Sequence, residues 1–82
     1  MRISACVITK NEAENLPRWL ASMRVFADEM IVVDTGSTDA TVETAHAGGA
    51  LVYHFDWIND FAAAKNFALD QAKGDWVVFT DA

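Results

Sequence analysis

The chain has 82 residues, 52% of them hydrophobic, and a formal net charge of −6 at pH 7. This length allows one domain at most, and the hydrophobic content is high enough for a core and excludes a disordered chain. Twelve acidic residues against six basic ones leave no basic stripe, so nucleic acid is not an expected partner.

The single cysteine, Cys6, lies in an apolar run, which favours a buried thiol and suits a reducing compartment. Met1-Arg2 leads into a short strand-like run rather than a signal peptide, and no stretch approaches the roughly 18 apolar residues of a membrane span. We therefore expect no transmembrane segment and a cytoplasmic location, with the inner face of the membrane left open for a longer protein.

The first predicted strand spans Ile3 to Thr9, a continuous apolar run typical of a strand buried on both faces. A helix is expected next, after the candidate N-cap Asn15. Its apolar positions recur at i, i+3, i+4 and i+7 and are Leu16, Trp19, Leu20 and Met23. A second continuous run, Met30 to Asp34, predicts the second strand.

The second helix is expected to begin at Thr38 or Asp39 and to end at Gly48-Gly49. A third strand is predicted from Ala50 to Phe55. The third helix should run from Asn59-Asp60 to Lys73, where Gly74 stops it. A last continuous run, Asp75 to Thr80, predicts the fourth strand, again buried on both faces.

Strands that alternate with helices across short connections predict an α/β fold with a parallel sheet and right-handed crossovers. We expect about four strands in the order 3-2-1-4, with three helices. In this order the ligand crevice lies outside the carboxyl ends of strands one and four, where the strand order reverses.

Acidic and polar residues gather after all four strands, at the edge where such folds bind ligands. The four segments are Thr9 to Glu12, Asp34 to Asp39, Asp56 to Asp60, and Thr80-Asp81. The opposite edge carries only the glycine helix stops. Asp39 and Asp60 are interpreted as helix-cap or turn acids. The coincidence of the four loops predicts a polar ligand site.

Three charged residues in or near these loops have two interpretations each. Asp34 can accept a hydrogen bond from a nucleobase ring N–H, or it can be a turn acid that bonds the amides of Gly36 or Ser37. Lys65 can reach a phosphate or stay solvated. Asp81 can hold ribose hydroxyls or a divalent ion that bridges a diphosphate.

Four segments, in this order, resemble the nucleotide-binding half of the family 2 glycosyltransferases, which have the GT-A fold. They are ISACVITKNEAENLPRWLASM, DEMIVVDTGSTDATVETA, DFAAAKNFALDQAKGDW and VVFTDA. The resemblance covers residues 1–82 and implies a single Rossmann-like, partial GT-A domain. Within the family the chain is similar to bacterial enzymes that add sugars to lipopolysaccharide cores or to peptides.

The resemblance implies a nucleotide-sugar donor, usually UDP-linked. Thr9 and Glu12 would contact the nucleoside, and Asp34 would read the base. Lys65 matches a position near the nucleotide that is commonly arginine. Asp81 matches the first acid of the D-x-D motif, which binds ribose and, through its second acid, Mn²⁺ or Mg²⁺.

The chain departs from the family pattern in two places, and each departure affects what we expect of it. Many members have Asp-Asp-Gly-Ser where this chain has Asp34-Thr35-Gly36-Ser37. The family also continues after Ala82 with the second D-x-D acid, the acceptor-binding half and the general base. We expect the front of a larger transferase, with no catalytic residue of its own and an incomplete metal site at Asp81. Such a chain would bind a UDP-type nucleotide weakly, transfer no sugar and self-associate through the edge of its fourth strand.

Two alternatives to a transferase remain open. The tetrapeptide Asp34 to Ser37 is also the signature of aspartic proteases, whose dimeric forms have subunits of similar length. Three helical periods argue against that nearly all-β fold. A non-catalytic nucleotide-binding or response-regulator-like module also fits the polar loops.

Overall fold

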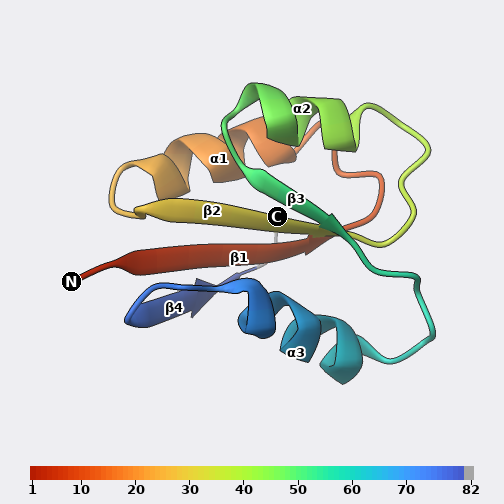
Figure 1. Ribbon diagram of the computed structural model, residues 1–82. Coiled ribbons are helices and arrows are strands. Elements are labelled where there is room, and N and C mark those ends of the chain that lie inside the picture. Colours follow the sequence, from red (N-terminus) through yellow and green to blue (C-terminus); the bar gives the residue numbers. More distant parts are fainter. Residues whose placement is uncertain (81–82) are drawn as a thin grey trace.

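Seven elements alternate along the chain in the predicted order, and the computed structural model describes residues 1–80 (Figure 1). The elements are β1 (Ile3–Thr9), α1 (Leu16–Arg24), β2 (Glu29–Asp34), α2 (Thr41–Ala47), β3 (Leu51–His54), α3 (Phe61–Gln71) and β4 (Trp76–Phe79). This α/β order with three helices confirms the predicted fold class. It excludes the aspartic protease, whose fold is nearly all β. No helix within residues 1–80 is long and apolar enough to cross a membrane.

All strand pairs are parallel, and the sheet order β3-β2-β1-β4 is the predicted one. Thr9, the last residue of β1, is level with Asp34, the last residue of β2. Asp34 is in turn level with His54 at the end of β3. Three strands therefore release their polar loops at one edge of the sheet, which is the right-hand edge in Figure 1.

Helices cover the sheet on both faces, with α1 and α2 on one side and α3 on the other (Figure 1). There is a hydrophobic core on each face of the sheet. Successive residues of the central strands pack into one core and then the other, because side chains alternate across a strand. Val7 and Val32 pack with α1 and α2, whereas Cys6 and Ile31 pack against α3. Burial raises the pKa of the Cys6 thiol to about 11, with the Glu29 charge adding to the effect, so this cysteine is the unreactive buried thiol that the sequence favours.

Two predictions are wrong for identifiable reasons, one about where a helix begins and one about the burial of a strand. α2 begins at Thr41, later than Thr38 or Asp39, because Asp39 Oδ1 accepts a hydrogen bond from the Thr41 amide at 3.0 Å and forms a turn ahead of the helix. The fourth strand is not buried on both faces. Trp76 is 62% exposed and Val77 40% exposed, because β4 is an edge strand.

The N-cap residues of α1 and α3 are the predicted ones, Asn15 and Asp60. Only one of them makes a capping hydrogen bond with its side chain. Asp60 caps α3 by accepting a hydrogen bond from the Ala63 amide at 3.1 Å, as predicted. Asn15 precedes α1 but its side chain makes no cap bond. Its amide nitrogen donates instead to Glu12 Oε2 at 3.3 Å.

The end of α3 is locked to the amino ends of the strands. Glu29 Oε2 accepts hydrogen bonds from the Ser4 hydroxyl and from the Lys73 amide, the latter at 2.7 Å. The Gly74 amide donates to Ser4 Oγ at 2.8 Å. Near the other end of β4, Trp19 Nε1 on α1 donates to the Thr80 hydroxyl at 2.7 Å. These bonds fix where β4 joins the sheet.

Candidate functional site

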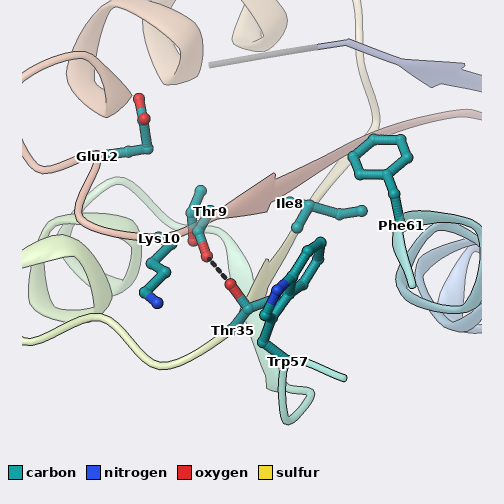
Figure 2. Close-up of a pocket in the computed structure, with 7 residues that line it drawn as sticks. All are labelled: Ile8, Thr9, Lys10, Glu12, Thr35, Trp57 and Phe61. Atoms are coloured by element: carbon teal, nitrogen blue, oxygen red, sulfur yellow. Dashed lines mark hydrogen bonds between the residues drawn. The ribbon is translucent and has the colours of Figure 1, made fainter. Parts of the chain in front are cut away.

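A pocket of about 240 Å³ lies at the carboxyl edge of the sheet (Figure 2). Its lining comes from the ends of β1 and β2 and from the segment between β3 and α3. The lining residues are Ile8, Thr9, Lys10, Glu12, Thr35, Trp57 and Phe61. Full ligand pockets usually measure roughly 300–1,000 Å³. This one therefore suits part of a ligand rather than all of it.

The pocket differs in position from the predicted crevice between strands one and four. No lining residue comes from β4. Phe79, the last residue of β4, packs edge-on against Phe61 with ring centroids 6.2 Å apart. Phe61 lines the pocket and Phe79 does not, so the pocket lies toward β1 and β2 rather than β4.

Two threonines form the deepest polar part of the pocket. Thr35 donates to the carbonyl oxygen of Thr9 twice, through its backbone amide and its hydroxyl, each at 2.9 Å. The hydroxyl of Thr9 donates to Asp34 Oδ1 at 3.0 Å. Both hydroxyl protons are therefore engaged within the protein, and both side chains are buried, with Thr9 1% and Thr35 5% exposed.

Asp34 stands directly behind this polar wall and is only 3% exposed. Its Oδ2 accepts from the amides of Gly36 at 3.2 Å and Ser37 at 2.9 Å, and its Oδ1 accepts from the Ser37 hydroxyl at 2.5 Å. Burial alone would raise the pKa of Asp34, but the bonds from Ser37, Gly36 and Thr9 outweigh it and hold the pKa below its ordinary value. Asp34 thus makes the bonds of the turn-acid interpretation.

The loops after β1 and β2 brace one another. Asn11, in a left-handed conformation with φ 56°, donates from its amide to the Ser37 hydroxyl at 2.8 Å. Its side-chain oxygen accepts from the Thr38 amide, also at 2.8 Å. The Glu12 amide donates to the Thr41 hydroxyl at 2.9 Å. These crossed bonds hold the polar wall of the pocket in one shape.

The opposite wall is apolar and comes from the β3–α3 segment. Trp57 is 43% exposed and Phe61 51% exposed, and both rings approach Ile8 (Figure 2). Trp57 Nε1 donates to Asn59 Oδ1 at 3.1 Å, and Asn59 is itself left-handed with φ 59°. Trp57 thus joins the lining from the segment between β3 and α3.

The structure brings three of the five predicted site residues together. Thr9 and Glu12 line the pocket, and Asp34 bonds to Thr9 from behind. Lys65 lies apart from the lining, with its ammonium 5.3 Å from the centre of the Phe79 ring. Asp81 lies outside the described residues.

Two polar lining residues were not selected from the sequence. Lys10 brings a positive charge to the side of Thr9 away from the aromatic rings (Figure 2). Thr35 supplies a hydroxyl that donates to the carbonyl oxygen of Thr9. Their position in the sequence could have identified both, because each directly follows the last residue of a strand. Ligands bind at this edge of the sheet in such folds.

Metal binding was predicted at Asp81. Within residues 1–80, no three His, Cys, Asp or Glu side chains lie close enough together to hold a metal ion. The described residues therefore do not form a metal site by themselves, and the part assigned to Asp81 stays a prediction.

A parallel sheet in the order 3-2-1-4, with its pocket at the carboxyl ends of the strands, defines a Rossmann-like α/β domain. The sequence model described as Glycosyl transferase family 2 matches residues 4–82. The chain belongs to this family, which confirms the resemblance inferred from the four sequence segments.

Two curated relatives match almost the whole of this chain. The chain is 49% identical over 81 residues to a TPR repeat-containing protein of Synechococcus elongatus and covers 20% of it. It is 44% identical over 81 residues to an uncharacterized glycosyltransferase of Rickettsia bellii and covers 27% of it. Each match takes in 99% of this chain.

Among solved structures, the chain is similar to glucosyl-3-phosphoglycerate synthase from Mycobacterium tuberculosis, crystallised with Mn²⁺, UDP and glucosyl-3-phosphoglycerate. The TM-score is 0.84 at 31% identity, over 98% of this chain and 33% of the synthase. The chain thus spans between a fifth and a third of the proteins that it matches.

Proposed function

We propose that this chain is the donor-nucleotide-binding part of a bacterial glycosyltransferase that uses a UDP-sugar. The acceptor class that we propose is a lipopolysaccharide core, a peptide or another glycan. The observation that carries the proposal is the pocket at the carboxyl edge of the sheet, where Thr9, Glu12 and Thr35 lie opposite two aromatic rings. The UDP bound to the similar mycobacterial synthase supports the nucleotide class.

Each residue of the proposed site has a separate task. Thr9 and Thr35 lie along the edge of the base, and Glu12 accepts from ribose hydroxyls. Asp34 does not contact the base directly in this proposal. It holds the loop after β2 and the Thr9 hydroxyl in position beside the base. Lys10 offsets the diphosphate charge, which matters in a chain of net charge −6.

Lys65 and Asp81 extend the proposed site beyond the pocket. Lys65 lies behind the Phe61–Phe79 pair and would serve the phosphates from that side. Asp81 would contact ribose and share a divalent ion with a second acid. We propose that the 82 residues alone bind the nucleotide weakly and transfer no sugar, because a divalent ion of this kind usually needs more than one carboxylate.

Calorimetric titration of UDP against ADP, with and without Mn²⁺, tests the proposal. We expect UDP to bind at least about tenfold more tightly than ADP, which corresponds to about 1.4 kcal/mol. Glu12→Ala should weaken UDP binding by about tenfold through the loss of a hydrogen bond to a charged group. The matched control is Glu14→Ala, an exposed neighbour outside the pocket, which should leave the affinity unchanged.

Two further proposals concern the surroundings of the chain. The buried thiol of Cys6 suits a reducing compartment, and we propose the cytoplasm. The outer edge of β4 carries exposed Trp76 and Val77, and we propose that this edge pairs with another strand.

A further inference from the structure

The two walls of the pocket differ in chemistry. Thr9, Lys10, Glu12 and Thr35 make one side polar, and Ile8, Trp57 and Phe61 make the other side apolar (Figure 2). A nucleobase has the matching asymmetry, because its edge carries hydrogen-bonding groups and its faces do not. A flat ligand can therefore satisfy both walls at once.

The indole ring of Trp57 is oriented by a hydrogen bond in its own loop and not by packing in the hydrophobic core. It belongs to neither cluster of buried residues and is 43% exposed. Its N–H group is already bonded to Asn59 within the same loop. What the ring offers to the pocket is therefore its apolar surface rather than its hydrogen-bond donor.

The neighbouring ring of Phe61 differs from Trp57 in having a structural partner. Phe61 packs edge-on against Phe79, which ties it to β4. Trp57 bonds only within its own loop, through the left-handed residue Asn59. An exposed aromatic ring that lines a pocket and is oriented by its own loop is suited to stack on a ligand.

We propose that Trp57 is the stacking platform for the nucleobase of the donor. The inference rests on the proposed nucleotide site and names the residue that binds the face of the base. Thr9 and Thr35 contact the base edge and select its identity, whereas Trp57 contributes affinity that tolerates different bases.

The test is a titration of the full chain with UDP, uridine and inorganic pyrophosphate. Trp57→Ala should weaken UDP and uridine binding by about tenfold or more, as expected for a lost base–aromatic stack. Pyrophosphate, which has no base, should bind unchanged. Trp57→Phe should keep most of the affinity because a smaller ring still stacks. The control is Trp76→Ala, an exposed tryptophan at the start of β4, which should have no effect.

The outcomes separate this inference from the proposed function. UDP binding that is unchanged by Trp57→Ala overturns the platform alone. Equal losses for UDP and pyrophosphate also overturn it, because the ring would then act on the whole site. ADP binding in place of UDP, with the same loss in Trp57→Ala, supports the platform and contradicts the uridine donor. No binding of either nucleotide overturns both.

Discussion

Asp34 shows how one side chain can serve a binding site without lining it. The carboxylate closes the turn after β2 and orients the Thr9 hydroxyl, and through that turn it places Thr35 in the pocket. The departure from the Asp-Asp-Gly-Ser pattern of many family members therefore falls on Thr35, a residue that lines the pocket. The family's second acid is replaced here by a hydroxyl.

Replacing Asp34 should cost stability in a pH-dependent way. Asp34→Asn puts an amide where Gly36, Ser37 and Thr9 all donate, so we expect a loss of about 1–3 kcal/mol in the free energy of unfolding at pH 7. The folded pKa of Asp34 lies below its ordinary value of 3.8. Its contribution is therefore complete above that value and is lost as the pH falls through the lower, folded value.

Urea denaturation of both proteins between pH 7 and pH 2 measures this effect. The difference between wild type and Asp34→Asn should be largest near neutral pH and shrink in acid. Asp70→Asn, an exposed substitution on α3, should stay within about 0.5 kcal/mol of wild type at every pH. A difference that is constant from pH 7 to pH 2 would contradict the assigned hydrogen bonds.

At the scale of elements, the close approach of the α3–β4 connection to β1 decides where β4 lies. A methyl group on Gly74 would stand 2.6 Å from Ser4 Oγ, 2.8 Å from the Ser4 amide nitrogen and 2.9 Å from the Arg2 carbonyl oxygen. Two of these three atoms belong to the backbone and cannot turn away.

Gly74→Ala should therefore destabilise the chain by about 1–3 kcal/mol, since β1 or β4 must shift to admit the methyl group. Gly48→Ala is the matched comparison. Its methyl group meets Leu20 Cδ1 at 2.5 Å, at the flexible end of a side chain, so the cost should be smaller. Chemical denaturation ranks the two variants, and equal or reversed costs would show that the backbone contact is not limiting.

At the scale of the whole molecule, the sheet ends at β4 with one side unpaired among residues 1–80. Exposed Trp76 and Val77 make this edge apolar, and unpaired apolar edges promote association between chains. The net charge of −6 opposes association, but β4 itself has no charged residue.

We expect the chain to self-associate with rising concentration, and Val77→Lys to suppress this by placing a charge on the edge. Light scattering over a concentration series measures the effect. Val25→Lys, at an exposed position after α1, should leave self-association unchanged. A monomeric wild type at high concentration would rule out the role of this edge.

The sequence by itself determined the alternation of elements, the parallel sheet and the edge where polar residues gather. Continuous runs such as Met30 to Asp34 and glycine stops such as Gly74 are local signals, and local signals locate elements well. The segment Thr9 to Glu12 and Asp34 were placed at the sheet edge in this way, because a residue at or after a strand end can be located before any contact is known. The family resemblance then selected Thr9 and Glu12 within that segment.

Only the tertiary structure decided which of these residues line the pocket. Asp34 turns inward because its own loop supplies three hydrogen bonds and Thr9 a fourth, and its buried neighbour Thr35 lines the pocket instead. Trp57 joins the same pocket from a segment more than twenty residues along the chain, through a left-handed turn at Asn59. Side-chain direction depends on loop conformation and on packing between distant segments, and neither has a period that can be read along the chain.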